Sequence, residues 1–139
     1  MSDGATGGLS RDGWTILEDD GFLGLVGPFW HRIVDGRHEY SIEGQAKHRN
    51  RRGVVQGGLT MTLADRSCGM TARYETGNKY LATVQLDMHF IDGAQIGDTI
   101  VSRPRIIRAT RSLIFMSTEV SAGDRCVATA NGVFKIMKG

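Results

Sequence analysis

One acidic residue, Asp65, lies inside a long apolar stretch of the sequence and is the first candidate for chemistry. An ionised carboxylate is costly to bury unless it is paired or hydrogen-bonded, so carboxylates are rarely buried without a reason. Two interpretations follow. Asp65 can pair with Arg66 or Arg73 on a solvated stripe, or it can be a catalytic carboxylate at the wall of a cleft, where partial burial makes it more basic.

Two glycines, Gly57 and Gly58, precede the apolar stretch and provide a second chemical feature. If a helix begins there, its uncovered backbone N–H groups lie at the positive end of the helix dipole, where an oxyanion or a phosphate is stabilised. Cationic side chains stand just upstream, at Lys47, Arg49, Arg51 and Arg52. An anionic ligand with a reactive carbonyl fits this arrangement better than a neutral ligand does.

The sequence predicts a helix from Leu59 to about Tyr74 that positions these groups. Its apolar residues fall on more than one face, which predicts a helix buried nearly all round in the middle of the domain. Gly57 and Asp65 are about 12 Å apart along such a helix, whereas an oxyanion donor and a base must both come within about 3 Å of the reacting atoms. We therefore expect them to come from two copies of the chain, whose antiparallel helices create two equivalent sites.

The rest of the chain is rich in strand-forming residues. Two strands, at 29–34 and 39–42, flank a turn at Asp35-Gly36 and precede the helix. Four strands follow it, at 82–91, 98–107, 113–120 and 125–137. This order predicts an α+β fold in which an antiparallel sheet packs on one long helix.

The strand at 82–91 alternates between apolar and polar residues, so we expect its apolar face on the helix. That face comprises Ala82, Val84, Leu86, Met88 and Phe90. Thr83 falls on the polar face, and it can reach a site on the helix only if this end of the strand bends inward.

Composition limits the other classes of function. The chain has 139 residues, of which 40% are hydrophobic and 23% are charged, which predicts one domain. Residues 1–13 are rich in Gly, Ser and Asp, so we expect them to form a mobile tail before a domain at 14–139. Cys68 and Cys126 make no disulfide framework, and free cysteines suit a reducing compartment. The sequence has no apolar run of about 18 residues. We therefore expect a soluble cytoplasmic protein without a membrane partner.

The charged and metal-binding residue types argue against two further classes of function, nucleic-acid binding and metal binding. A net charge of +2 is too small to indicate nucleic-acid binding, and the basic cluster at 49–52 lacks interleaved aromatic residues. His31, His38 and His89 do not have metal-ligand spacing. We expect neither a nucleic-acid partner, nor a metal, nor a cofactor.

The sequence around the predicted helix start resembles a known family. The run His48-x-Asn50-x-x-Gly53-x-x-Gln56-Gly57-Gly58, followed by Leu63-Ala64-Asp65, is similar to the signature of the hotdog-fold acyl-CoA thioesterases of the phenylacetate-pathway type, close to the pattern of thioesterase superfamily member 2. The resemblance covers about 27–138. It implies a sheet wrapped around a central helix, a homodimer whose two sheets join, and a homotetramer formed as a dimer of dimers. The family has a second His where this chain has Gln56.

The resemblance also implies catalytic roles. The Gly57 N–H would stabilise the oxyanion of the thioester, and Asn50 would orient the carbonyl or the attacking water. Asp65 of the partner chain would act either as a general base on water or as a nucleophile that forms an anhydride. Thr83 matches a Ser or Thr position that holds the water.

Five further residues are candidates for substrate binding: His48, Gln56, Gly58, Arg108 and Arg111. His48 can instead order its own loop. Gln56 can donate an amide N–H where the family His would donate from its ring, without titrating. The two arginines suit the phosphates at the nucleotide end of coenzyme A, although either can be a solvated surface charge.

These features favour an acyl-CoA thioesterase that hydrolyses a medium-chain or aromatic acyl-CoA. The absence of the second His leaves a non-catalytic acyl-CoA binder or sensor as the alternative. A hotdog hydratase or dehydratase fits less well because no separate His-rich motif accompanies Asp65. The sequence does not specify the acyl chain, the chemical role of Asp65, or whether the protein is a dimer or a tetramer.

Overall fold

The computed structural model describes residues 13–139, so the expected tail at 1–13 lies outside the described residues except for Gly13. The strands are β1 (Thr15–Ile16), β2 (Trp30–Val34), β3 (Arg37–Glu43), β4 (Leu81–Phe90), β5 (Thr99–Ala109), β6 (Leu113–Ala122) and β7 (Arg125–Ile136). The helices are α2 (Phe22–Val26), a 3-10 turn η1 (Ala46–His48) and α3 (Gly57–Thr76).

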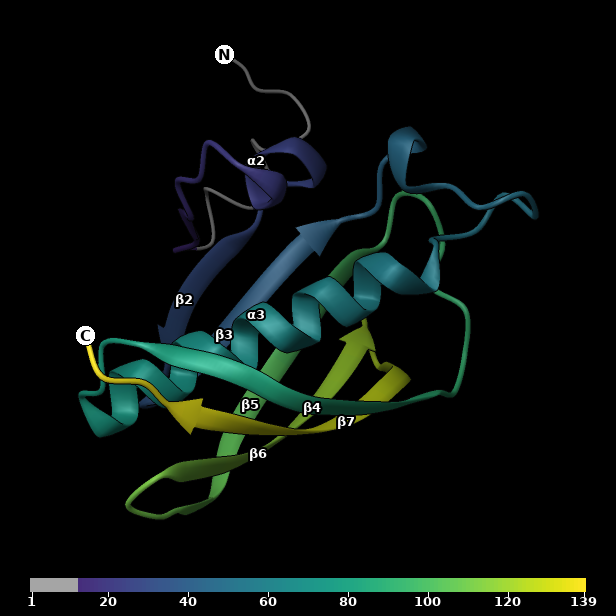
Figure 1. The fold of residues 1–139 in the computed structure, drawn as a ribbon. Coiled ribbons are helices and arrows are strands. Elements are labelled where there is room, and N and C mark those ends of the chain that lie inside the picture. The colour runs from purple at the N-terminus through teal and green to yellow at the C-terminus, as the bar shows by residue number, and fades with distance from the viewer. Residues whose placement is uncertain (1–12) are drawn as a thin grey trace.

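The strands form one seven-stranded antiparallel sheet in the order β1-β2-β3-β5-β6-β7-β4. Helix α3 lies across the sheet (Figure 1) and contacts every strand from β3 to β7. The predicted α+β architecture, a sheet wrapped around one long helix, is therefore confirmed. The two strands predicted before the helix correspond to β2 and β3, and the four predicted after it correspond to β4 to β7, whereas β1 was not predicted. Strand β4 is an edge strand.

The β2–β3 hairpin forms at the predicted turn. Asp35 and Gly36 both have positive φ, at 52° and 78°, the backbone that a two-residue hairpin loop requires and that an Asp-Gly pair adopts readily. Helix α2 follows the short strand β1, and the carbonyl of its last residue, Val26, receives the side chain of His48. Among residues 13–139, no helix is both long and apolar enough to cross a membrane.

Helix α3 begins at Gly57, after the N-cap residue Gln56, and ends at Thr76. The C-cap residue Gly77 has the left-handed φ of 75° that favours glycine after a helix. The face toward the sheet is buried and includes Leu59, Leu63, Ala64, Cys68 and Ala72. The expectation of a helix buried nearly all round is wrong for the single chain, because the sheet covers only one side and leaves residues such as Tyr74 exposed.

The register of β4 differs from simple alternation. A β-bulge at Val84 interrupts its pairing with β7, since Thr83 pairs with Phe134 and Gln85 pairs with Val133. A bulge inserts one residue and reverses which side chains face each way. The predicted single apolar face is therefore wrong at its start: Val84 is 58% exposed, and Thr83 shares the side of the buried Phe134.

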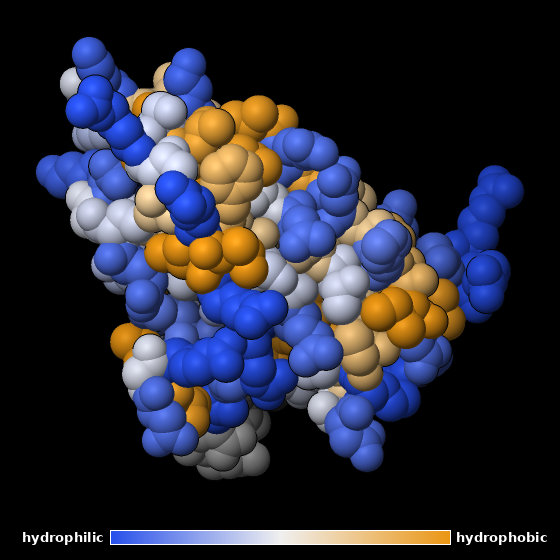
Figure 2. Space-filling model, turned by 90° about the horizontal axis from the view of Figure 1, so that it is seen from below, coloured by the Kyte–Doolittle hydropathy of each residue, from blue (hydrophilic) through white to orange (hydrophobic). Residues whose placement is uncertain are grey.

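Exposed apolar side chains remain on the single chain. Seen from below, they lie in separate groups among charged residues (Figure 2). The large apolar side chains exposed on β4 and the segment after it are Val84, Phe90 and Ile91.

Candidate functional site

The bulge in β4 brings together two of the predicted catalytic residues. Asp65 lies half-buried on α3, and the Thr83 hydroxyl donates a hydrogen bond to its Oδ1 at 2.7 Å. Asp65 Oδ2 has no partner among residues 13–139. Neither Arg66 nor Arg73 forms an ion pair with Asp65 in this part of the chain, so the paired alternative is not observed.

A surface pocket of about 300 Å³ lies beside Asp65. Its rim carries three cations, Arg66, Arg73 and Lys79, and Asp65 is its one acidic residue. Sequence reasoning treated Arg66 and Arg73 as partners of Asp65 and missed all three as lining. The spacing of Asp65, Gly69 and Arg73 places them along one stripe of a helix, and this signal could have identified Arg73. The pocket therefore combines a free carboxylate oxygen with surrounding positive charge.

The nearest thiol does not compete with Asp65 as a nucleophile. Burial raises the pKa of the Cys68 thiol to about 12, and the negative charge of Asp65 acts in the same direction. The thiolate is the reactive form of cysteine, so Cys68 remains a protonated core residue at neutral pH.

The first turn of α3 presents one free amide. The Gln56 N–H donates to the His48 carbonyl at 2.8 Å, and the Gly58 N–H donates to the side-chain oxygen of Gln56. The Leu59 N–H donates to the Gln56 carbonyl at 3.0 Å. The Gly57 N–H has no acceptor within the described chain. Gly57 thus provides the uncovered donor that the sequence predicts, whereas Gly58 is capped by Gln56.

Gly57 also lines a pocket of about 420 Å³. The other wall is formed by the end of β4 and the loop after it, including Phe90, Ile91 and Asp92. The Phe90 ring lies close to Gly57, since a Cβ added there would stand 3.2 Å from Phe90 Cε1. Any larger side chain at this position would therefore press on the ring.

Asn50 organises the loop that leads to α3. Its Oδ1 accepts the Arg52 N–H at 2.8 Å and the Val54 N–H at 3.2 Å. Gly53, with a φ of +85°, completes this turn in a conformation that favours glycine. The Asn50 Nδ2 group has no partner among residues 13–139 and remains available as a donor.

His48 is buried, with 5% of its surface exposed. Its Nδ1 accepts the Gln45 N–H at 2.8 Å, so its Nε2 carries the proton and donates to the Val26 carbonyl at 2.6 Å. Burial lowers the pKa of His48, while the bond to Val26 acts in the opposite direction. Both ring nitrogens are therefore used in ordering this loop, as the alternative interpretation of His48 expects.

The predicted site residues do not all line the same pocket. His48, Gln56 and Gly58 line one pocket of about 320 Å³ at the start of α3. Arg108 and Arg111 are exposed at the β5–β6 end and line neither the Gly57 pocket nor the Asp65 pocket. In one chain, Gly57 and Asp65 line separate pockets. No group of three or more side chains suited to hold a metal ion occurs within residues 13–139.

Comparisons with known proteins concern the family and the fold of this chain. The family model described as "Thioesterase superfamily" matches residues 52–128. The Pseudomonas aeruginosa protein named "Putative esterase PA0474" is 32% identical over 124 residues, covering 87% of this chain and 92% of that protein.

Two solved structures share the fold. Zebrafish thioesterase superfamily member 2 superposes with a TM-score of 0.78 at 20% identity, covering 86% of this chain and 89% of that one. The BH2602 protein from Bacillus halodurans, solved with CoA, superposes with a TM-score of 0.71 at 21% identity, covering 78% and 74%. The family match, the esterase-named relative and the shared architecture lead to one conclusion: this chain belongs to the thioesterase superfamily and has the hotdog fold.

Proposed function

We propose that this protein is an acyl-CoA thioesterase with Asp65 as its catalytic carboxylate. One observation carries the proposal: the Thr83 hydroxyl holds Asp65 Oδ1 at 2.7 Å at the wall of a pocket, while Oδ2 stays free. A carboxylate fixed through one oxygen presents the other in a defined direction, which suits proton abstraction or attack.

The second catalytic group is the Gly57 N–H. It points from the N-terminus of a twenty-residue helix, where the helix dipole adds to its attraction for negative charge. When a thioester carbonyl is attacked, its oxygen becomes an oxyanion that this donor stabilises. Asp65 Oδ2 either takes the proton of the attacking water or attacks the carbonyl carbon itself. The C–S bond then breaks, and the thiolate of coenzyme A leaves and is protonated. On the nucleophilic route, water then hydrolyses the anhydride between the acyl group and Asp65, which releases the free acid and restores the carboxylate.

The two groups act on one thioester only if they come from two chains. They line separate pockets of the single chain, and their separation of about 12 Å along one helix exceeds the reach of a single reacting carbonyl. We therefore propose a homodimer with sites shared between subunits, assembled further as a dimer of dimers. Asn50 Nδ2 would orient the carbonyl or the water at this shared site.

The substrate proposed is a medium-chain or aromatic acyl-CoA. The cations Arg66, Arg73 and Lys79 around the Asp65 pocket favour an anionic ligand, and the structural neighbour from Bacillus halodurans was solved with CoA. Arg108 and Arg111 remain proposed contacts for the nucleotide phosphates. Two free cysteines, Cys68 and Cys126, support placing the enzyme in the cytoplasm, where thiols stay reduced.

A panel of CoA thioesters with thiol release as the readout tests the proposal. Asp65→Asn keeps the size of the side chain and its hydrogen bond with Thr83, but it removes the basic oxygen. We expect kcat to fall at least about a hundredfold with an unchanged Tm. Turnover equal to that of the wild type in this variant would reject the assignment.

One observation favours a second function, that of a non-catalytic acyl-CoA binder. The family His is Gln56 here, and its carboxamide oxygen is engaged by the Gly58 N–H. A binder would show saturable acyl-CoA binding without thiol release, and Gln56→His would then restore hydrolysis. Thiol release by the wild-type chain would exclude this alternative.

A further inference from the structure

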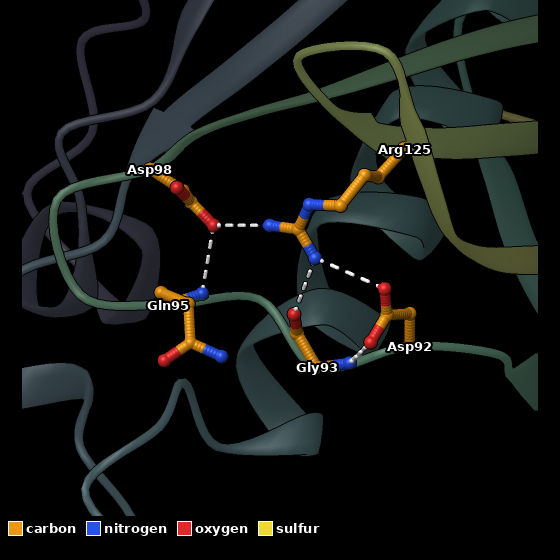
Figure 3. A network of polar contacts seen from close by, with 5 residues as sticks. All are labelled: Asp92, Gly93, Gln95, Asp98 and Arg125. Atoms are coloured by element: carbon orange, nitrogen blue, oxygen red, sulfur yellow. Dashed lines mark hydrogen bonds and ion pairs between the residues drawn. The ribbon is translucent and has the colours of Figure 1, made fainter.

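Arg125, at the start of β7, joins two ends of the loop between β4 and β5 (Figure 3). Its Nη1 donates to Asp92 Oδ2 at 3.1 Å and to the Gly93 carbonyl at 3.0 Å. Its Nη2 donates to Asp98 Oδ2 at 2.9 Å. One guanidinium thus bridges the beginning and the end of the 92–98 loop.

The carboxylates of Asp92 and Asp98 also accept hydrogen bonds from backbone N–H groups within the loop. Asp92 Oδ1 accepts the Gly93 N–H at 2.8 Å, and Asp98 Oδ2 accepts the Gln95 N–H at 2.8 Å. The pKa of Asp92 is lowered, chiefly by its hydrogen bond from Arg125. The loop is therefore closed by a charge network whose only cation is Arg125 among the residues drawn in Figure 3.

The middle of this loop supports the segment that ends at Gly57. The Val55 N–H donates to the Ala94 carbonyl at 2.9 Å, and Val54 and Gln95 form an antiparallel bridge. Val55 lies two residues before Gly57, and Ala94 shares the walls of the Gly57 pocket. A movement of the loop would therefore be transmitted to the backbone that aims the Gly57 amide.

We propose that Arg125 is a positioning residue that fixes the direction of the Gly57 N–H through the 92–98 loop. The inference rests on the proposed oxyanion role of Gly57. Arginine suits this task because its planar guanidinium donates in two directions at once. A lysine presents a single charged point and can satisfy only one side of the loop at a time.

The contribution of Arg125 to global stability is expected to be small. Its side chain is 38% exposed, and the side chains of Asp92 and Asp98 are 54% and 28% exposed. Ion pairs between groups that remain open to solvent are weak. The expected consequence of losing Arg125 is therefore local: the loop and the 54–57 segment become less ordered, while the fold remains.

Arg125→Ala tests the proposal with two readouts. Amide exchange measured by NMR should be about tenfold faster at the Val55 N–H, because its acceptor Ala94 is no longer held. With acyl-CoA substrate, kcat should fall about tenfold to a hundredfold, as expected when a catalytic donor is misaligned. KM should stay within about twofold, since the donor acts mainly in the transition state. Arg125→Lys should recover part of both losses.

Arg103→Ala is the matched control. Arg103 also makes a two-sided network, donating to Glu39 at 2.6 Å and to Ser121 at 2.8 Å, but these partners lie on β3 and β6, and Arg103 makes no hydrogen bond to the 92–98 loop within the described chain. This variant should leave Val55 exchange and kcat unchanged. Unchanged Val55 exchange in Arg125→Ala, or an equal loss of kcat in both variants, would overturn the proposal. If the wild type hydrolyses no thioester, the proposed function fails, and Val55 exchange alone decides the structural link.

Discussion

Replacing Gly57 with proline removes the proposed oxyanion donor and adds ring atoms whose Cβ contacts Phe90. Gly57 is the first residue of α3, the position where proline is favoured because its missing N–H would have no intrahelical partner. The preceding residue, Gln56, already has φ −67° and ψ 133°, the extended backbone that a residue before proline requires. The variant is therefore expected to fold with α3 intact.

The expected loss can be estimated from the donor alone. Removing one oxyanion donor typically lowers kcat by about a hundredfold to a thousandfold, or about 3 to 4 kcal/mol of transition-state stabilisation. Because the Gly57 N–H has no acceptor in the described chain, its loss breaks no bond of the folded protein. We expect kcat for acyl-CoA hydrolysis to fall by this factor, with KM nearly unchanged.

Gly57→Ala is the control for this experiment. Its Cβ meets the Phe90 ring at 3.2 Å, as the proline Cβ does, but it retains the N–H. Steady-state thiol release should therefore separate the two variants by about a hundredfold or more, with circular dichroism showing the same helix content. Equal activities in Gly57→Pro and Gly57→Ala would refute the oxyanion role of Gly57.

Two further predictions concern other residues of the site. Thr83→Val removes the 2.7 Å hydrogen bond to Asp65, so kcat should fall about tenfold or more in the thiol-release assay, whereas Thr83→Ser should retain activity; wild-type activity in Thr83→Val would show that the bond does not orient Asp65. Burial lowers the pKa of His48 in the folded protein below its usual value of 6.5. At a pH between the folded pKa and 6.5, the unfolded chain therefore binds more protons at His48 than the folded chain does. The contribution of His48 to folding stability should be fully present above pH 6.5 and decline as pH falls below it. Urea unfolding at several pH values should show a weaker acid loss in His48→Gln; an identical pH profile in that variant would contradict this.

The helix start and the hairpin turn could be predicted because their signals are local. Gly57 and Gly58 mark the beginning of α3, and Asp35-Gly36 marks the β2–β3 turn, without reference to distant parts of the chain. For Asp65, the sequence left two alternatives open: an ion pair with a neighbouring arginine, or a catalytic carboxylate at the wall of a cleft. The structure distinguishes these alternatives through the hydrogen bond from Thr83 to Asp65. The alternating pattern of the strand did not predict that the Thr83 side chain faces the helix.

The remaining features could not be predicted because they depend on contacts between distant segments. The bulge at Val84 has no signature in the alternation of β4, yet it turns Thr83 toward Asp65. The buried Ser67 hydroxyl bonds to Ser102 at 2.7 Å across thirty-five positions of sequence. Periodicity assigns residues to faces of their own element, and it contains no information on the partner across the core.

The central claim is that Gly57 of one subunit and Asp65 of its partner act on the same thioester, and subunit complementation tests it most directly. Gly57→Pro and Asp65→Asn chains carrying different affinity tags are co-expressed, and the mixed dimers are purified through both tags. A shared site predicts that mixed dimers recover about half of the wild-type activity, because one of two equivalent sites contains both intact groups. Activity no higher than that of either parent variant would contradict the account.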